Sequence, residues 1–465
     1  MILNLIVYFI FYLWSVKCCL LFNDKPVSRT SIRNLEVPIL PETNWGSKNN
    51  GKESTEIRPF KIDVPQSVGS KLSNVSSVYP LEDTAWTYGI STKYLNTILD
   101  YWTSKYNWTA RQALLNKYPQ FKTNIQGLDI HFYHVRPTNL PKDRKLKVLP
   151  LMIIHGWPGT VVELQKIIPM LTTPSPNHDF VFELIVPSLP GYGFSEGAVR
   201  PGMGAAQIAV IFKNLMHRLG FEKFYLQGGD WGSLVSSNMA SLFPEKVIGV
   251  HLNMCNFNRP SGLFWGIVGS YFPSLVVESE HYSKFYPLST TIKTLVEESG
   301  YFHIQATKPD TIGAALTSSP DGLAAYIIEK FSTWTNKAYR ERDDGGILEK
   351  FTLDELLDNV MVYWVTNSIT TSARLYAESL NSAYRALKIE ELPVKVPTGC
   401  AMFPHELLAQ PKSILASKYQ NIIQYNYMIR GGHFAAFEEP RILADDVFSF
   451  VKKTEEVTKQ SEQKK

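Results

Sequence analysis

The sequence predicts an α/β fold with a mostly parallel sheet, and three observations support this prediction. Continuous apolar runs of strand length recur between residues 128 and 254, alternating with helical segments. The same rhythm returns after residue 393, and the long stretch between the two blocks lacks such runs. Because a strand that is apolar along its whole length is buried on both faces, helices must cover both sides of the sheet.

The composition excludes several other classes of protein. The chain has 465 residues, 44% of them hydrophobic and 19% charged, with 47 basic and 43 acidic residues. Ordinary apolar content and a small net charge exclude extensive disorder, and without a long basic run we expect no nucleic-acid partner. Cys18 and Cys19 are adjacent, whereas Cys255 and Cys400 lie far apart. This spacing predicts neither a disulfide framework nor a zinc site.

Residues 1–22 are expected to anchor the chain in a membrane. No charged side chain occurs from Ile2 to Val16 and, with Lys17 tolerated, the apolar stretch continues to Phe22. At ~1.5 Å per residue, a helix of this length spans the ~30 Å hydrocarbon core of a bilayer. Basic residues follow the segment, which predicts a single-pass protein with a cytosolic body. The alternative is a cleaved signal peptide, although no Lys or Arg precedes the apolar stretch.

The rest of the chain divides into five parts. Residues 23–125 predict a linker and a helical region wrapping the core, because aromatic and apolar residues recur at helical spacing near Tyr94 and Trp102. Residues 126–255 and 393–453 form the two parts of the α/β core, and residues 256–392 between them form a helical lid. The charged residues 454–465 predict a disordered tail. Strands are expected at 128–135, 146–154, 181–186, 223–227, 247–254, 394–401 and 422–428, with helices at 208–219 and 440–451.

The most specific motif is Gly228-Gly229-Asp230-Trp231-Gly232, which lies between a predicted strand and a predicted helix. Gly-x-nucleophile-x-Gly is the nucleophile elbow of α/β-hydrolases, with Asp in place of the usual Ser. With a reference pKa of ~3.9, Asp needs no base to activate it. Its attack on an sp³ carbon forms an ester that water can cleave, whereas attack by Ser would leave a stable ether. Asp230 therefore predicts cleavage of a carbon–oxygen or carbon–halogen bond by displacement.

Hydrolysis of such an ester requires a base, which we expect to be His433 after the last strand. The acid that orients His433 should follow the seventh strand, where the sequence offers Glu406; Glu438 and Glu439 are alternatives beside the histidine. His155-Gly156-Trp157-Pro158 follows the third strand, where this fold supplies one backbone donor of the oxyanion hole. The predicted donors are the N–H groups of Trp157 and Trp231.

A leaving epoxide oxygen would need a proton donor on the lid side. Tyrosines of the insertion are the natural candidates, and the residues alone do not choose among them. They are Tyr271, Tyr282, Tyr286, Tyr301, Tyr326, Tyr339, Tyr363 and Tyr376.

Together these stretches resemble the microsomal epoxide hydrolase family, which includes the insect juvenile hormone epoxide hydrolases. The resemblance covers the N-terminal anchor and continues to about residue 455. It rests on the segments 57–60, 127–132, 155–159, 190–195, 228–233, 298–301, 403–408 and 431–436, which read IRPF, GLDIHF, HGWPG, PGYGFS, GGDWGS, ESGY, FPHELL and GGHFAA.

The resemblance implies an α/β-hydrolase fold with an eight-stranded sheet and a helical lid after strand six. It implies Asp230 as nucleophile, Glu406 and His433 as the pair that activates water, and Tyr301 and Tyr376 as lid proton donors. It further implies that lipophilic epoxides are converted to vicinal diols at the endoplasmic reticulum membrane, without metal or organic cofactor. A haloalkane dehalogenase and a non-catalytic carrier are the alternatives.

Overall fold

The computed structural model describes residues 37–46, 54–65, 83–143, 145–257 and 260–463. The predicted anchor, residues 1–22, lies outside the described residues. Within those ranges, none of the helices combines the length and the apolar character needed to cross a bilayer. Residues up to Pro38 separate from residues 39–465 as a unit of their own, and the features below all belong to the second unit.

The described residues contain a nine-stranded sheet in the order β1-β2-β3-β5-β4-β6-β7-β8-β9. Strands β4 to β9 pair in parallel, whereas β1, β2 and β3 join the edge of the sheet in antiparallel fashion. The strands are β1 (Arg58–Phe60), β2 (Gln120–Ile125), β3 (Leu128–Val135), β4 (Lys147–Ile154), β5 (Phe180–Pro187), β6 (Phe224–Gly228), β7 (Val247–Leu252), β8 (Thr398–Met402) and β9 (Ile422–Tyr427).

The expectation of eight strands was therefore wrong by one. The additional strand, β1, has three residues and lies at the edge of the sheet, where its proline is tolerated. So short a segment carries no alternation that a sequence pattern could reveal. Both β1 and β2 lie in the region 23–125, for which we expected only a linker and helices.

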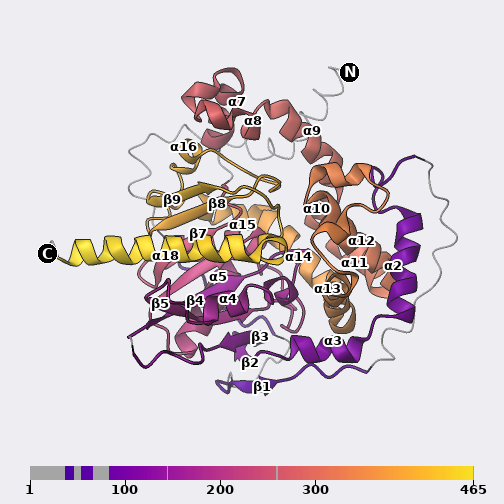
Figure 1. Ribbon diagram of the computed structural model, residues 1–465, viewed down its shortest axis with the longest axis horizontal. Coiled ribbons are helices and arrows are strands. Elements are labelled where there is room, and N and C mark those ends of the chain that lie inside the picture. Colours follow the sequence, from indigo (N-terminus) through magenta and orange to yellow (C-terminus); the bar gives the residue numbers. More distant parts are fainter. Residues whose placement is uncertain (1–36, 47–53, 66–82, 144, 258–259, 464–465) are drawn as a thin grey trace. The chain divides into compact units, whose positions relative to one another are not determined.

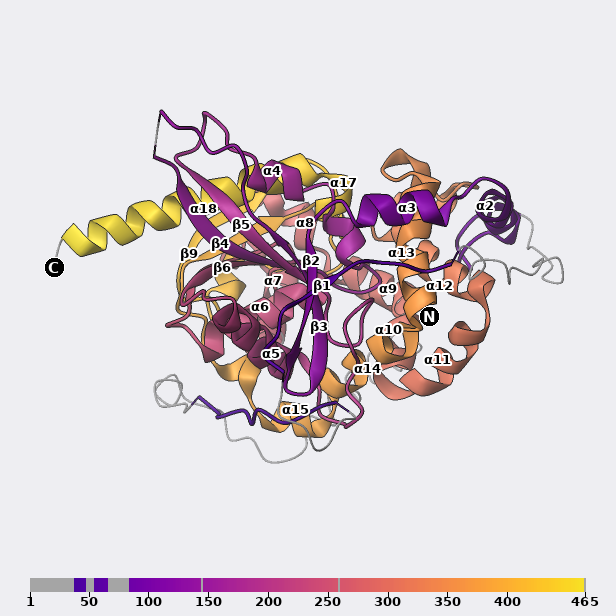
Figure 2. The ribbon, with the colours of Figure 1, turned by 90° about the horizontal axis from the view of Figure 1, so that it is seen from below.

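Helices cover both faces of the sheet, as the apolar strands require (Figures 1 and 2). Helices α4 (Ile168–Thr172) and α18 (Pro440–Gln463) lie on one face, and α5 (Ala205–Arg218) and α6 (Asp230–Leu242) lie on the other. On the α18 side, Phe182, Tyr225, Val447 and Phe450 belong to one buried apolar cluster. Burial of this cluster between helix and sheet fixes the strand ends that carry the site.

The predicted disordered tail is also wrong, because α18 continues to Gln463. Thr454 is fully buried, and its hydroxyl donates to the Phe450 carbonyl at 2.9 Å. The Glu455 carboxylate accepts hydrogen bonds from Tyr225 and Lys147, each at 2.8 Å. One of the charges that suggested disorder, that of Glu455, thus has partners on the sheet.

A disulfide joins Cys255, which follows β7, to Cys400 in β8. The two cysteines are 145 positions apart, and their Cα atoms lie 5.6 Å from each other. The prediction from cysteine spacing failed because β7 and β8 are neighbours in the sheet although the insertion separates them in the chain.

Every described element between β7 and β8 is a helix, in agreement with the helical insertion expected at 256–392. Helices α10 to α13 lie on the same side of the sheet in both views (Figures 1 and 2). The α-helices are α7 (Pro260–Tyr271), α8 (Tyr282–Phe285), α9 (Leu288–Glu298), α10 (Gly300–Thr307), α11 (Pro309–Ser318), α12 (Pro320–Thr333), α13 (Leu353–Thr366), α14 (Ile369–Leu380) and α15 (Ser382–Ala386).

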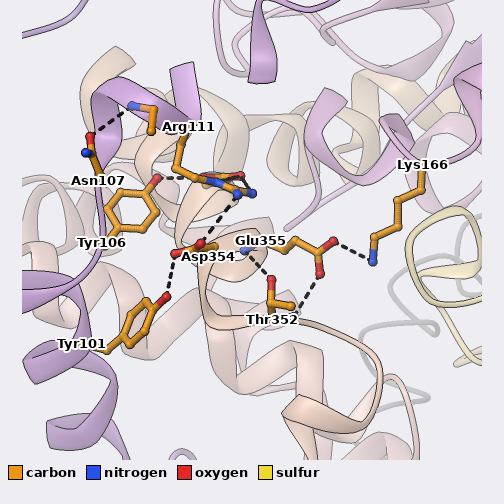
Figure 3. A network of polar contacts seen from close by, with 10 residues as sticks. Tyr101, Tyr106, Asn107, Arg111, Lys166, Thr352, Asp354 and Glu355 are labelled. Atoms are coloured by element: carbon orange, nitrogen blue, oxygen red, sulfur yellow. Dashed lines mark hydrogen bonds and ion pairs between the residues drawn. The ribbon is translucent and has the colours of Figure 1, made fainter. Parts of the chain in front are cut away.

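Two N-terminal helices, α2 (Thr92–Ser104) and α3 (Trp108–Leu115), pack on α13 of the insertion. The Tyr101 hydroxyl donates to Asp354 at 2.9 Å, and the Tyr106 hydroxyl donates to Asp358 at 2.8 Å (Figure 3). Arg111 holds Asp358 through Nε at 3.0 Å and through Nη2 at 2.6 Å. The helical spacing found in residues 94–102 is therefore real, and its partner is the insertion.

Candidate active site

Asp230 occupies the sharp turn between β6 and α6. Its φ angle of 49° lies in the left-handed region, which aims the side chain away from the sheet. Gly232 is required here, because a Cβ atom at this position would lie 2.0 Å from the Ile154 carbonyl oxygen. The turn can therefore pack against the end of β4 only without side chains at its flanking positions.

The turn after β4 lies against the Asp230 carboxylate. The backbone N–H of Trp157 donates to Asp230 Oδ1 at 2.7 Å. A Cβ at Gly156 would lie 2.2 Å from the same oxygen, so glycine is what permits this approach. Of the two predicted backbone donors, Trp157 is the one that holds Asp230 in this structure. Trp231 follows Asp230 at the start of α6, and its ring meets Tyr376 edge-on at 4.7 Å between centroids.

His433 links Asp230 to Glu406. Its Nε2 lies 3.5 Å from Asp230 Oδ2, and its Nδ1 lies 2.7 Å from Glu406 Oε1. The backbone N–H of His433 donates to the Trp334 carbonyl at 3.0 Å, which fixes the histidine loop against the insertion. Burial lowers the pKa of His433, but the charges and hydrogen bonds of Glu406 and Asp230 outweigh burial and raise it well above its ordinary value.

The two alternative acids have other partners. Glu439 accepts hydrogen bonds from Lys350 at 2.6 Å and from Arg430 at 2.8 Å. Glu438 accepts from the backbone N–H of Phe434 at 3.0 Å. Glu406 is thus the carboxylate that touches the His433 ring.

Two of the eight candidate tyrosines combine a ring contact with Trp157 and a pKa that the charge of Asp230 helps to raise. Tyr301 on α10 stacks on Trp157 with a centroid distance of 5.1 Å, and Tyr376 on α14 meets Trp157 edge-on at 6.0 Å. Burial raises the pKa of both hydroxyls well above the ordinary value of 10, and the charge of Asp230 adds to this effect. Tyr326 also packs on Trp157, but the charge that adds to burial there is that of Glu329.

Two family models match this chain. The model described as "Epoxide hydrolase N terminus" matches residues 57–164, and the model described as "alpha/beta hydrolase fold" matches residues 150–389. The chain belongs to the epoxide hydrolase family.

Full-length relatives agree with the assignment to the epoxide hydrolases. "Juvenile hormone epoxide hydrolase 1" of Ctenocephalides felis is 51% identical over 95% of this chain and 97% of its own length. "Epoxide hydrolase 1" of Sus scrofa is 48% identical over 90% of this chain and 93% of its own. The crystal structure of juvenile hormone epoxide hydrolase from the silkworm Bombyx mori superposes with a TM-score of 0.87 at 48% identity, covering 90% of this chain and 99% of that one. The predicted α/β-hydrolase fold and family are confirmed, and the dehalogenase and carrier alternatives are set aside.

In this epoxide hydrolase the Trp157 turn is held by Asn359, which sequence reasoning missed, and by Tyr363, which it named only as a candidate proton donor. On α13, the Asn359 side chain donates to the Pro158 carbonyl at 2.7 Å, and the Tyr363 hydroxyl donates to the Gly159 carbonyl at 3.0 Å. About two hundred positions separate them from the turn, so no local motif could join them. The available signal was weak: Asn359 follows Asp358 directly before the apolar run 360–365, and it is almost fully buried.

Sequence reasoning also missed Glu163, which lies four positions beyond Gly159. Its carboxyl belongs to a cavity that Asp230 and His433 also line. The signal was a single charged residue inside the apolar segment Val161–Leu164. Among the described residues, no group of three or more His, Cys, Asp or Glu side chains is arranged to hold a metal ion.

Proposed function

We propose that this epoxide hydrolase converts lipophilic epoxides to vicinal diols through a covalent ester on Asp230. The observation that carries the proposal is the continuous chain of contacts from the Trp157 N–H through Asp230 and His433 to Glu406. Tyr301 and Tyr376 come from the insertion, and both rings pack on Trp157. Every step uses groups of the chain and a water molecule.

In the first step, Asp230 Oδ2 attacks an epoxide carbon from the side opposite the oxygen. The ring opens, and the negative charge moves to the epoxide oxygen, where Tyr301 and Tyr376 donate hydrogen bonds and a proton. This assignment is supported by the buried position of both hydroxyls near the Asp230 charge. Donors aimed at developing charge in a dry site are the strongest form of electrostatic catalysis.

In the second step, water attacks the carbonyl carbon of the ester. His433 takes a proton from the water, Glu406 stabilises the resulting imidazolium, and the backbone N–H of Trp157, with that of Trp231, holds the oxyanion on Asp230. The electrostatics also set the order of events. The negative charge of Asp230 helps to raise the pKa of His433, and formation of the ester removes that charge. His433 therefore becomes easier to deprotonate. The proton that it releases replaces the one that the tyrosines gave to the epoxide oxygen, so a neutral base is present when water attacks.

We also propose that the enzyme is a single-pass protein of the endoplasmic reticulum membrane, anchored by residues 1–22 with its catalytic body in the cytosol. A second apolar segment supports contact with lipid: no charged residue occurs from Pro260 to Val277. The large apolar side chains exposed in this segment are Phe264, Trp265, Ile267, Tyr271, Phe272 and Leu275. A bilayer suits such a surface, and it also concentrates a lipophilic epoxide near the site.

Flotation with phosphatidylcholine vesicles tests the membrane proposal. The full chain should float, and Phe264→Ser with Phe272→Ser should reduce flotation of a chain that begins at residue 23. If the shortened chain floats equally well with and without the two substitutions, the segment 260–277 does not contact lipid.

The mechanism is tested by a single turnover in oxygen-18 water. Excess enzyme is mixed with a lipophilic epoxide, and the molecular mass of the diol is measured by mass spectrometry. Unlabelled diol is expected, because its new oxygen comes from Asp230. Fully labelled diol would mean direct attack by water, and Asp230 would then be a base instead of a nucleophile.

A further inference from the structure

A small cavity lies beside the nucleophile, at the side where hydrolysis must occur. The space that the centre of a water molecule can occupy in this cavity is about 20 Å³. About 10–15 Å³ by this measure accommodates one water, provided that two to four polar groups can bind it. The cavity meets both conditions. Its polar lining comes from Glu163, Gln227, Asp230, Asn253 and His433, and the remainder from Ile154, Gly156, Trp157, Leu164, Gly229, Phe434, Ala435 and Ala436.

Gln227 and Asn253 give the cavity a fixed polar wall. Gln227 Nε2 donates to Asn253 Oδ1 at 2.8 Å, so the two side chains hold each other in place. Both are almost fully buried. The pair therefore gives the cavity a fixed polar surface at which a water molecule can find hydrogen-bonding partners.

Glu163 forms the wall on the side of the Trp157 turn. It lies in the short helix η3 (Val161–Leu164), and a Cβ at Gly159 would lie 2.1 Å from its Oε2. Gly156 and Gly159 thus let two carboxyl groups approach the same turn, with Asp230 against the first and Glu163 against the second. The role of Asp230 is accounted for by the covalent mechanism, whereas no step of that mechanism uses Glu163.

Burial decides the protonation state of the Glu163 carboxyl. Burial raises the pKa of Glu163 to about 8; the charge of Asp230 adds to this effect, while His433 and a backbone hydrogen bond from Gly156 oppose it. At neutral pH the group is therefore mainly the uncharged acid. An uncharged carboxyl can accept a hydrogen bond from water without placing a second negative charge beside Asp230.

We propose that Glu163 is a positioning residue for the hydrolytic water. The inference rests on the proposed covalent mechanism. Water in the cavity gives one hydrogen bond to His433 Nε2 and the other to the carbonyl oxygen of Glu163, which aims its oxygen at the ester carbon of Asp230. The new bond joins the water oxygen to that carbon, and the bond to the diol oxygen breaks. His433 takes one water proton and passes it to the diol oxygen, and the second proton then protonates His433.

Two substitutions at Glu163 separate this role from a packing role. Glu163→Gln keeps the volume and the carbonyl acceptor, whereas Glu163→Leu keeps similar volume and loses the acceptor. Glu438→Gln is a matched control, because burial also raises the pKa of Glu438 to about 8 and Glu438 does not line the cavity. Ester formation is followed by tryptophan fluorescence and by mass measurement of the acid-quenched Asp230 peptide. Ester hydrolysis is followed by diol release.

Glu163→Leu should slow ester hydrolysis by roughly 10- to 100-fold, the effect of losing one hydrogen bond of about 1–3 kcal/mol to a buried group. Ester formation should change by less than about threefold, so the ester accumulates. Glu163→Gln should restore hydrolysis to near the wild-type rate, and Glu438→Gln should leave the ratio of the two rates unchanged.

Equal slowing of both steps in Glu163→Leu, or failure of Glu163→Gln to restore hydrolysis, would overturn the role in positioning water. If Glu163→Leu does not fold, Glu163→Ala takes its place, because alanine also removes the acceptor and causes less crowding. The rates of Glu163→Ala are then compared with those of Glu163→Gln. If the wild-type protein forms no ester at all, the covalent mechanism itself fails, and this outcome is distinct from the others.

Discussion

The candidate active site has two sides that differ in charge. We call them the core wall (Asp230, His433 and Glu406) and the insertion wall (Tyr301 and Tyr376). On the core wall, Asp230, His433 and Glu406 form a chain of ionisable groups with contacts of 3.5 and 2.7 Å. On the insertion wall, the hydroxyls of Tyr301 and Tyr376 are buried, and burial raises the pKa of both well above the ordinary value of 10. Under the proposed mechanism, this difference divides the reaction: the core would supply the nucleophile and the base, and the insertion would supply donors for charge that appears only during ring opening.

The walls also differ in how the chain holds them. The core groups follow β6, β8 and β9, so the parallel sheet brings the ends of these strands together. The insertion is held through α13. This helix binds the Trp157 turn through Asn359, and it binds the N-terminal helices through Asp354 and Asp358 (Figure 3). The core wall is therefore set by local motifs and the insertion wall by contacts far apart in sequence.

The largest effect should come from the core wall. Asp230→Ala is expected to lower diol formation by at least about 10⁴-fold, the scale on which removal of a nucleophile acts. Circular dichroism and the thermal midpoint should remain close to those of the wild type. Substantial diol formation by the folded variant would mean that Asp230 is not the nucleophile.

The next effect distinguishes the two steps on the core wall. His433→Gln should slow ester hydrolysis by roughly 10²- to 10⁴-fold, because the base is lost, and should slow ester formation far less. The ester on Asp230 should then be detectable by mass measurement after mixing with substrate. His405→Gln, a half-buried histidine that does not touch Asp230, is the control and should show no accumulation. Loss of ester formation in His433→Gln would place the histidine in the first step instead.

The insertion wall is tested by removing hydroxyl groups. Tyr301→Phe and Tyr376→Phe should each slow ester formation by roughly 10²-fold, because each removes one donor to the developing alkoxide, and should leave ester hydrolysis unchanged. Tyr326→Phe is the matched control, since its hydroxyl is also buried without a partner and its ring also packs on Trp157. An equal loss in Tyr326→Phe would remove the distinction among the three tyrosines.

The same contrast explains which features could be predicted from the sequence. Asp230, His433 and the Trp157 turn stand in short motifs next to strands, and strand order alone brings them together. The disulfide between Cys255 and Cys400 and the contacts of Asn359 depend on segments that meet only in three dimensions. The local periodicity of a sequence does not reveal which distant segments come into contact.

The elements of the fold also divide into those that local sequence patterns predict and those that they do not. The buried parallel strands were predicted because their apolar runs are continuous, whereas the three-residue β1 lies below the length at which alternation can be seen. Residues 454–463 are charged and were expected to be disordered, but Thr454 and Glu455 have partners on α18 and the sheet. Charge patterns report solvation only when the charges lack partners elsewhere in the fold.

The attachment of the insertion wall should appear in stability. Asp358→Asn should lower the free energy of unfolding by about 3 kcal/mol, because Arg111 then loses its buried anionic partner. Tyr106→Phe removes one hydrogen bond from the same cluster and should cost about 1 kcal/mol. Urea unfolding measures both. Equal effects of the two variants would mean that the charge pair adds nothing to the hydrogen bond.

The smallest effect concerns uncharged carboxyl groups on the core side. Burial raises the pKa of Glu438 to about 8 from an ordinary value of 4.5. Between these values the folded state holds a proton that the unfolded state has released, so stability falls as pH rises through this window and falls no further above about pH 8. Glu438→Gln cannot ionise and should reduce this loss, giving a shallower decrease in thermal midpoint from pH 5 to pH 8. Glu297→Gln, at an exposed carboxylate paired with Arg340, should keep the wild-type slope. A wild-type slope in Glu438→Gln would mean that Glu438 is ionised in the folded protein, and that the core wall holds more negative charge than its contacts suggest.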